Sequence, residues 1–325
     1  MKIAIDAMGG DYAPEEIVKG AIFSLEEQDL EVILLGNKDK IEEELKKYKF
    51  REKKLLIIDC KESIETSEFP LNALRTKKNS SIVVGMNLLK DNKADAFISA
   101  GNSGAVMAAA LLILGCISQL RRPAIPAILP TAKGKALILD VGANVDCKPE
   151  HLAQFALMGS KYAKYIFKIN DPKIGLLNIG EEESKGNKFV QNAYKILNNS
   201  NINFIGNIEG RDIFKGKADV VVCDGFIGNI LLKSSEGLAK LLLAEVNKII
   251  ITQLPQNQEM NQLREKFMEL IKMTDYTEYG GSLLLGINGL CFICHGRSKS
   301  KAIKNAIINA SKFVDSDILK HLEEI

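Results

Sequence analysis

The feature that most constrains the fold is a repeated order of segments: an apolar run of strand length, a polar residue, a glycine turn and a helix. The stretch from Ala96 to Gly115, AFISAGNSGAVMAAALLILG, shows this order in its shortest form. Its helical part, from Ala105 to Leu114, is apolar on every side, and such a helix is usually buried inside a larger protein. The stretch therefore predicts a buried strand, a tight turn and a buried helix.

The same order recurs along the whole chain without a repeat of solenoid length, which is typical of a largely parallel sheet covered by helices. The 325 residues allow one large α/β domain or two domains. The stretch from Ala124 to Pro130 contains two prolines and predicts an edge strand or an irregular segment. We expect strands at 2–6, 32–35, 55–59, 96–98, 136–140, 174–178, 202–206, 220–223 and 287–294. We expect helices at 14–27, 38–47, 70–90 (broken), 105–114, 149–167, 187–197 and 230–273 (interrupted near Pro255), with two more at the end of the chain.

Composition indicates an ordinary globular protein, since 46% of the residues are hydrophobic and 26% are charged. The 43 basic and 41 acidic residues nearly balance, which argues against bulk nucleic-acid binding. The first residues carry no signal-peptide pattern, and the longest nearly uncharged run, 105–118, is too short to cross a bilayer. We therefore expect a cytoplasmic protein with free thiols. The haem-attachment spacing from Cys291 to His295 is interpreted as accidental, because it lies in an apolar, strand-like run.

Five predicted strands end in a polar residue that a glycine follows within a few positions: Asp6, Ser99, Asp140, Asn178 and Asp224. A residue that caps the next helix explains any one of them. In a parallel sheet, however, the carboxyl ends of the strands lie along one edge, and ligands bind in the crevice outside them. Together the five turns predict a shared functional cleft.

The chemistry of that cleft is limited by what the sequence lacks. It contains no Ser–His or Cys–His pairing in a recognisable context and no standard phosphate or dinucleotide fingerprint. A covalent mechanism and a nicotinamide site are therefore unsupported, and no cofactor is expected. The turns offer amides, backbone N–H groups and the loop cation Lys185, which suit transfer to a substrate that is already a nucleophile.

The turns also carry a family resemblance. The motifs are Asp6-Ala-Met-Gly-Gly-Asp11, Ser99-Ala-Gly-Asn-Ser-Gly-Ala105, Asp140-Val-Gly-Ala-Asn-Val-Asp146, Asn178-Ile-Gly-Glu, Lys185-Gly-Asn187, Asp219 to Asn229 and Tyr279-Gly-Gly281. In this order they resemble the bacterial phosphate acyltransferase (PlsX) family over essentially the whole chain. Two positions depart from the family pattern: Tyr12 stands where histidine is common, and Ser103 stands where threonine is usual.

The resemblance implies that inorganic phosphate attacks the thioester of acyl–acyl carrier protein, giving acyl phosphate for phospholipid synthesis. It also implies a three-layer αβα, Rossmann-like fold akin to phosphotransacetylase and isopropylmalate dehydrogenase. A homodimer, a peripheral relation to the membrane and a downstream membrane glycerol-3-phosphate acyltransferase follow from the same resemblance. We expect a single α/β catalytic domain over residues 1–325, with a protruding helical hairpin at about 238–273.

The expected site residues follow from the resemblance together with the chemistry. Phosphate is placed near the Ser99–Ala105 turn with Asn102, Ser103 and Lys185. The thioester oxygen is assigned amide donors, which Asp6, Asp140 and Asp224 orient. The catalytic set is Lys185, Asn178, Asp224 and Asn229. The substrate-binding set is Asp6, Gly9, Gly10, Asp11, Ser99, Gly101, Asn102, Ser103, Gly104, Asp140, Asn144, Gly281 and His295. Magnesium binding by the aspartates is a competing interpretation, although no metal is expected, and His295 serves the site or only packing.

Other segments leave alternatives open. The apolar stripe of the 238–273 hairpin, with Leu238 and Leu242, indicates a dimer interface or a surface that touches lipid or the acyl chain. The basic residues Arg75, Lys77, Lys78, Arg121 and Arg122 are solvated charges or a docking cluster for the acidic carrier protein. Alternative functions are an NAD-dependent dehydrogenase of the related fold and a non-catalytic acyl-binding protein.

Overall fold

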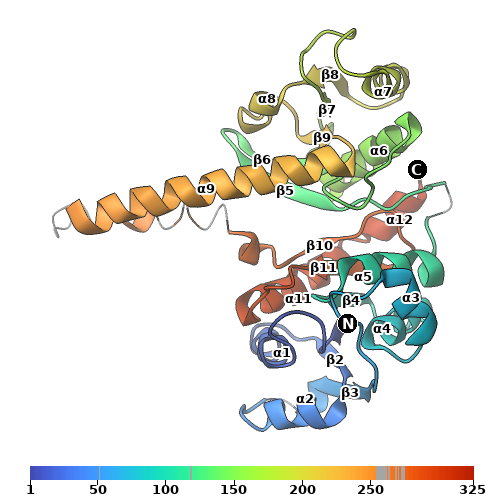
Figure 1. Cartoon of the computed structure of the whole chain (residues 1–325), viewed down its shortest axis with the longest axis vertical. Helices are drawn as coiled ribbons and strands as arrows, with labels where there is room; N and C mark the ends of the chain where they lie inside the picture. The colour runs from blue at the N-terminus through green and yellow to red at the C-terminus, as the bar shows by residue number, and fades with distance from the viewer. Residues whose placement is uncertain are drawn as a thin grey trace. The chain divides into compact units, whose positions relative to one another are not determined.

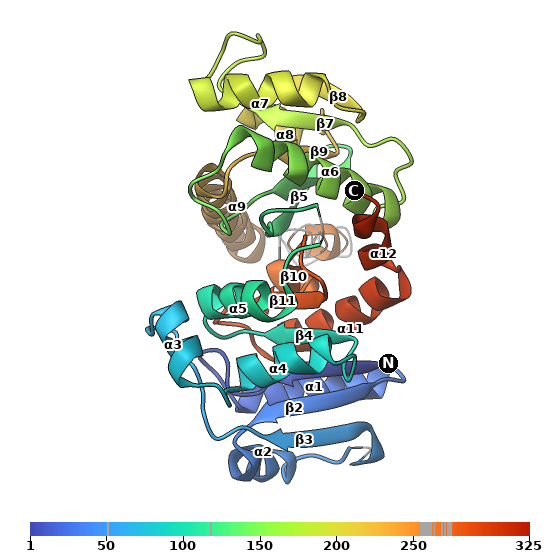
Figure 2. The same ribbon diagram turned by 90° about the vertical axis from the view of Figure 1, so that its right-hand side faces the viewer.

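The computed structural model describes residues 1–50, 52–117, 119–253, 262, 264–267, 269, 271 and 275–325. Contact density divides the chain into two compact units. Unit 1 comprises Met1–Ile125, Lys164–Lys168 and Tyr279–Ile325, and unit 2 comprises Pro126–Ala163 and Ile169–Glu278. Each unit has its own β-sheet, seen from two directions in Figures 1 and 2. That the two units act as one catalytic domain stays a prediction.

The sheet of unit 1 has six strands, and its neighbours are parallel except for the edge pair β10–β11. The order is β10 (Gly281–Leu283), β11 (Leu290–Cys294), β4 (Ala96–Ser99), β1 (Lys2–Asp6), β2 (Glu31–Gly36) and β3 (Leu55–Asp59). The central strands β1 and β4 are almost continuously apolar and buried, as expected of parallel strands covered on both faces.

One face of this sheet packs against α4 (Ser81–Lys90) and α5 (Ser103–Ala109), whose residues share a buried cluster with Ala4, Phe97 and Cys291. Phe292, on the opposite face, meets Phe313 of α11 (Ser300–Asp315) edge to face, with ring centroids 5.4 Å apart. Helix α11 in turn packs against α1 (Glu15–Glu27). Unit 1 therefore has the three-layer αβα arrangement that was predicted. Its other helical segments are α2 (Lys38–Leu45), η1 (Glu52–Lys54), α3 (Pro70–Thr76), η2 (Ala110–Leu114) and α12 (Ile318–Glu323).

The sheet of unit 2 has five strands, in the order β5 (Pro126–Thr131), β6 (Gly134–Leu139), β9 (Val220–Val222), β7 (Ile174–Leu177) and β8 (Phe204–Ile208). Strand β5 is antiparallel to β6 and lies at the edge, while the remaining pairs are parallel. The edge position accommodates its two prolines, which cannot donate a ladder hydrogen bond. The prediction of an edge strand is thus confirmed. The helical segments of this unit are α6 (Pro149–Tyr165), α7 (Lys188–Asn198), α8 (Gly210–Phe214), α9 (Gly225–Gln253) and η3 (Tyr276–Glu278).

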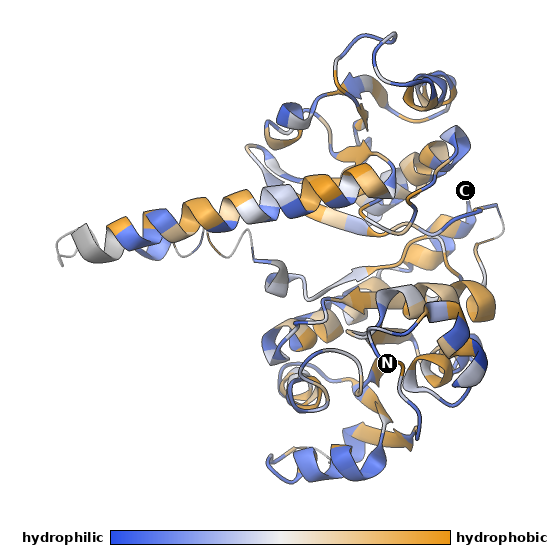
Figure 3. Ribbon diagram, viewed as in Figure 1, coloured by the Kyte–Doolittle hydropathy of each residue, from blue (hydrophilic) through white to orange (hydrophobic). Residues whose placement is uncertain are grey.

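Helix α9 begins at Gly225, five residues before the predicted start. The Oδ1 atom of Asp224 accepts the N–H groups of Phe226 and Ile227, both at 3.0 Å, and so caps the first turn. From Asn229 to Ile249 no residue of the helix is buried, and Figure 3 shows hydrophobic residues along most of its length. Most of the predicted second arm of the hairpin, after Gln253, lies outside the described residues.

Two other differences are local. The helix predicted up to Leu114 changes to π geometry at Ala110–Leu114, and α8 was not predicted because it is only five residues long. Among the described residues, no helix has both the length and the apolar content needed to cross a bilayer.

Candidate functional site

The polar centre of unit 1 is a buried pair at the ends of the adjacent strands β1 and β4. Asp6 and Ser99 are 2% and 1% exposed, and the Ser99 hydroxyl donates to Oδ2 of Asp6 at 2.7 Å. Oδ1 of Asp6 accepts the N–H of Met8 at 3.2 Å, and the Ser99 oxygen accepts the N–H of Gly101 at 3.0 Å. The pair therefore fixes the two turns that follow these strands.

Burial raises the pKa of the Asp6 carboxyl, and hydrogen bonds from Ser81, Ser99, Met8 and Gly9 partly oppose that rise. The Ser81 hydroxyl comes from the first turn of α4 and was not anticipated from the sequence. A carboxyl enclosed by donors in this way orients the turn around it, and a role in positioning substrate donors stays a prediction.

Glycines let three turns of unit 1 pack together. A Cβ on Gly9 would lie 2.4 Å from Oδ2 of Asp6 and 2.7 Å from the nitrogen of Gly101. Gly10 has a φ of +103°, and the N–H of Asp11 donates to the carbonyl of Gly296 at 2.8 Å. The turns after β1, β4 and β11 thus meet at one edge of the sheet, as parallel topology requires.

Two of the expected site residues lie at the carboxyl end of β11 and opposite it on β10. His295 is exposed directly after the strand, and Gly281 pairs with Cys294, whose sulfur would lie 2.8 Å from a Cβ at Gly281. Tyr12, where the family commonly has histidine, has the ammonium of Lys299 5.5 Å from its ring centroid. Aromatic and cationic groups therefore replace an imidazole at this position.

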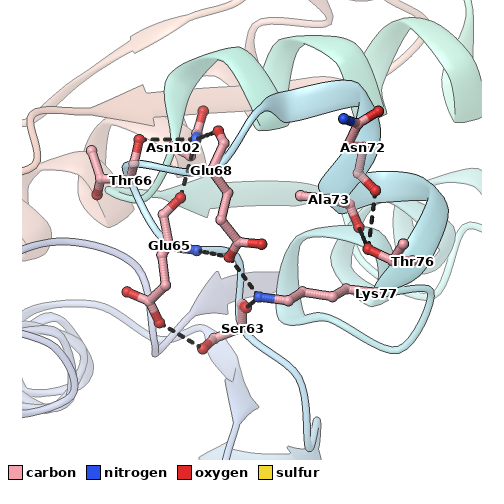
Figure 4. A network of polar contacts seen from close by, with 9 residues as sticks. All are labelled: Ser63, Glu65, Thr66, Glu68, Asn72, Ala73, Thr76, Lys77 and Asn102. Carbon is pink, nitrogen blue, oxygen red and sulfur yellow. Dashed lines mark hydrogen bonds and ion pairs between the residues drawn. The ribbon is translucent and has the colours of Figure 1, made fainter.

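Asn102 has a structural task that the sequence did not reveal. Its Oδ1 accepts the N–H of Ala105 at 3.0 Å and caps α5. Its Nδ2 lies 3.2 Å from the carbonyl oxygens of Glu65 and Thr66 and 3.0 Å from that of Glu68 (Figure 4). Because the side-chain donors of Asn102 are directed at these carbonyls, an anion at this turn would depend on the Ser103 hydroxyl and first-turn N–H groups.

Lys77 closes the same loop from the other side. Its ammonium donates to Glu68 Oε1 at 2.5 Å and to the Ser63 carbonyl at 2.7 Å, and its side chain is 30% exposed (Figure 4). The hydrogen bond from Lys77 lowers the pKa of Glu68. Lys77 therefore holds the 62–69 loop closed through Ser63 and Glu68, and we call these contacts the clasp. Arg75 and Lys78 are exposed on the surface.

The polar centre of unit 2 is Asp140, directly after β6 and 0% exposed. Its Oδ1 accepts the N–H groups of Gly142 and Ala143 at 3.2 and 3.1 Å. Its Oδ2 accepts the backbone N–H of Asn144 at 2.7 Å and the Asn144 amide at 2.9 Å. Four donors on one carboxylate fold the 140–144 turn into a fixed shape.

The start of α9 packs against this turn and donates hydrogen bonds to it. The N–H of Gly225 donates to the Asn144 carbonyl at 2.8 Å, and the Asn229 amide donates to the Val141 carbonyl at 3.1 Å. A Cβ on Gly228 would lie 1.9 Å from the Asp140 carbonyl oxygen. The structure thus brings together Asp140, Asn144, Asp224 and Asn229.

Asn178 and Lys185 are brought together at the end of β7. Asn178 donates to the Lys185 carbonyl at 3.1 Å and accepts the N–H of Ile179 at 2.8 Å, which closes the loop between them. The side chain of Lys185 is exposed and its stem packs against Gly180. Since β7 neighbours β9, this loop stands at the same edge of the sheet as the start of α9.

The buried thiols of Cys223 and Cys294 are poor nucleophiles. Burial raises the pKa of Cys223 well above its ordinary value and raises that of Cys294 to about 12. Cys291 and Cys294 are buried in β11, which agrees with the interpretation of their spacing as accidental. In the described residues, no group of three His, Cys, Asp or Glu side chains is arranged to hold a metal ion.

The residues that sequence reasoning missed are Ser81, Glu68, Gly228 and Gly296. Gly296 had a usable signal, because it follows the last strand as the other turn glycines follow theirs. Ser81 and Glu68 act across long sequence separations, and nothing local to them indicates their partners.

Comparison with known proteins decides the family. A model of a family described as fatty acid synthesis protein matches residues 1–321. A phosphate acyltransferase from Dictyoglomus thermophilum is 49% identical over 326 residues, which cover 100% of this chain and 97% of that relative. The chain belongs to the phosphate acyltransferase family.

Other comparisons agree. A phosphate acyltransferase from Thermoanaerobacter pseudethanolicus is 50% identical over 329 residues, covering 100% of this chain and 97% of the relative. The crystal structure of a phosphotransacetylase from Streptococcus pyogenes matches with a TM-score of 0.66 and 21% identity, covering 97% of this chain and 94% of that one. The structural likeness confirms the predicted fold, and family membership identifies this member as an acyltransferase.

Proposed function

We propose that this acyltransferase moves a fatty acyl group from the thioester of acyl carrier protein to inorganic phosphate. A phosphate oxygen adds to the carbonyl carbon to give a tetrahedral oxyanion, whose collapse breaks the carbon–sulfur bond, forming acyl phosphate and releasing the carrier thiolate. No enzyme nucleophile is needed, in keeping with the raised pKa of the buried Cys223. Because a thiolate is a good leaving group, the chief demand on the protein is to stabilise the oxyanion and bind phosphate.

The observation that carries the acyl half of this proposal is the fixed amide of Asn229. One of its two Nδ2 hydrogens bonds to the Val141 carbonyl, and Gly142, with a φ of +140°, lies against the same amide. A donor held in this way does not need to reorganise as charge develops on the thioester oxygen. Asn144 and Asn178 are further donors of the same kind, and Asp140 and Asp224 orient the turns that carry them.

Phosphate is assigned to the Ser99–Gly104 turn of unit 1. The N–H groups of Ser103 and Gly104 precede the first bond of α5, from the Val106 N–H to the Asn102 carbonyl, and the exposed Ser103 hydroxyl adds a donor. The loop cation Lys185 is assigned to charge stabilisation. Magnesium binding by the aspartates is not needed, since N–H groups occupy the oxygens of Asp140.

The test is phosphate-dependent release of carrier thiol from purified protein and acyl carrier thioester, with the acyl phosphate trapped by hydroxylamine. We expect both signals in the native protein and a loss of about 10²-fold or more in kcat for Asn229→Ala, as for removal of an oxyanion donor. Asn199→Ala is the matched control, because Asn199 also donates its amide to a backbone carbonyl, that of Lys195, but does so at the end of α7. Tight acyl binding without turnover would support a non-catalytic acyl-binding protein instead.

We also propose that α9 pairs two copies of the chain. Leu238, Leu241, Leu242, Val246 and Ile249 follow helical spacing and are 41–60% exposed. Burying such a stripe against its counterpart suits an isologous dimer. Sedimentation of the native protein and of Leu238→Glu tests this: a monomer in both cases would leave lipid contact as the role of the stripe. We further propose that the acyl phosphate product passes to a membrane glycerol-3-phosphate acyltransferase.

A further inference from the structure

Large apolar side chains stand exposed in three turns at the carboxyl edge of the unit 2 sheet. Val145 is 61% exposed, Ile179 82%, Phe226 53% and Ile227 44%. Val145 follows β6, Ile179 follows β7, and Phe226 and Ile227 follow β9. We call these four side chains the apolar rim. Exposed apolar groups gathered at one edge mark a contact surface more often than scattered ones do.

The rim is held by the same polar residues that form the candidate site. Asp224 accepts the N–H groups of Phe226 and Ile227 at 3.0 Å. Asn178 accepts the N–H of Ile179 at 2.8 Å, and Asp140 binds the N–H of the residue before Val145 at 2.7 Å. In each turn a polar side chain accepts backbone N–H groups and fixes the backbone, while a neighbouring apolar side chain is exposed. Fixed backbones lower the entropy cost of binding a ligand.

The three turns are neighbours in the sheet. Strand β9 pairs in parallel with β6 on one side and with β7 on the other. Adjacent strands are about 4.8 Å apart, so the rim spans about 10 Å across the edge. This breadth suits a hydrocarbon chain lying across the strand ends.

Charge around the rim indicates which ligand it takes. Asp146 follows Val145, and Glu182 and Glu183 come soon after Ile179; these three carboxylates are exposed, whereas Glu181 in the same loop pairs with Lys217 at 2.6 Å. These carboxylates disfavour an anionic lipid headgroup seated on the rim itself, whereas a hydrocarbon chain carries no charge to repel.

From these observations we propose that the apolar rim of Val145, Ile179, Phe226 and Ile227 binds the hydrocarbon chain of the acyl thioester and so sets chain-length preference. The inference rests on the proposed function, because the chain is attached to the carbonyl that Asn144, Asn178 and Asn229 are assigned to polarise. Ile179 is the most exposed member and contributes through contact with the chain alone.

The experiment compares hexadecanoyl and butanoyl thioesters of acyl carrier protein as substrates of Ile179→Ala and Val145→Ala. Each buried methylene is worth a factor of about four, so we expect Ile179→Ala to lower kcat/KM for the long chain about tenfold or more. The value for the short chain should stay within about twofold, and Ile179→Leu should restore the preference. Leu56→Ala is the control, since Leu56 is an equally apolar side chain, 56% exposed, on β3 of unit 1.

The outcomes separate this inference from the proposed function. No turnover of either thioester by the native protein would defeat both. Turnover with equal losses for the two chain lengths, or with no loss, would overturn the role of the rim alone. An equal rise in the inhibition constant of carrier protein that bears no acyl group would also overturn it, because the rim would then contact protein rather than hydrocarbon.

Discussion

Gly228→Ala offers a sharp test of how α9 is seated on the Asp140 turn. The new Cβ would lie 1.9 Å from the Asp140 carbonyl oxygen. Ordinary carbon–oxygen contacts are about 3.3–3.6 Å, so the helix start must move by more than about 1 Å. Such a shift weakens the bonds from Gly225 to Asn144 and from Asn229 to Val141.

The expected loss follows from these contacts. Two weakened hydrogen bonds cost about 1 kcal/mol each, and overpacking adds about 1–3 kcal/mol. Alanine gains about 1 kcal/mol of helix propensity over glycine, which leaves a net loss of about 2–4 kcal/mol in the free energy of unfolding. A misplacement of this size also predicts a fall in activity of about 100-fold.

Denaturant unfolding, paired with the thiol-release assay, measures both effects. Gly237→Ala is the control within the same helix, because no atom lies within 4 Å of its added Cβ. It should gain up to about 1 kcal/mol in stability and keep full activity. If Gly228→Ala is as stable and active as Gly237→Ala, the described packing of the start of α9 on the Asp140 turn is wrong.

Three further outcomes follow from polar contacts and burial. The N–H of Ser300 donates to Glu16 Oε2 at 2.6 Å and lowers the pKa of Glu16. The ionised carboxylate therefore stabilises the folded state above the ordinary glutamate pKa, and this stabilisation is lost as pH falls through the lowered pKa of the folded state. Glu16→Gln should flatten the stability profile there, and an unchanged profile in unfolding at stepped pH would count against this contact. Cys223 should resist iodoacetamide at pH 7, because burial keeps its thiol protonated; rapid alkylation of the folded protein would contradict that. Lys77→Met should speed proteolysis of the 62–69 loop, whereas Lys78→Met should not; equal rates would rule out the clasp.

The sequence predicted the fold well where periodicity and turn residues agree. The runs at 2–6 and 55–59 have their predicted bounds, and the two prolines correctly placed β5 at an edge. Prediction was poorer where a single capping side chain decides where a helix begins. The Asp224 cap set the start of α9, and helical periodicity did not reveal it.

The candidate site shows the same division. Polar residues followed by glycine correctly indicated which turns are built around Asp6 and Asp140. What each side chain does there depends on partners that no local pattern encodes. Asn102 was assigned to phosphate, yet its amide is directed at the carbonyls of a loop more than thirty residues earlier in the chain. Lys77 was interpreted as a solvated charge or a docking charge, and no local pattern indicated its ion pair with Glu68.

The interleaved path of the chain has a consequence for synthesis. Strand β11 lies between β10 and β4, yet it is translated only after residues 126–278 have emerged from the ribosome. At about 5–20 residues per second, the edge of β4 waits roughly 10–40 s for this neighbour. During that interval the nascent first unit exposes an unpaired, strongly apolar strand edge, which is the stage at which chaperones have most to protect.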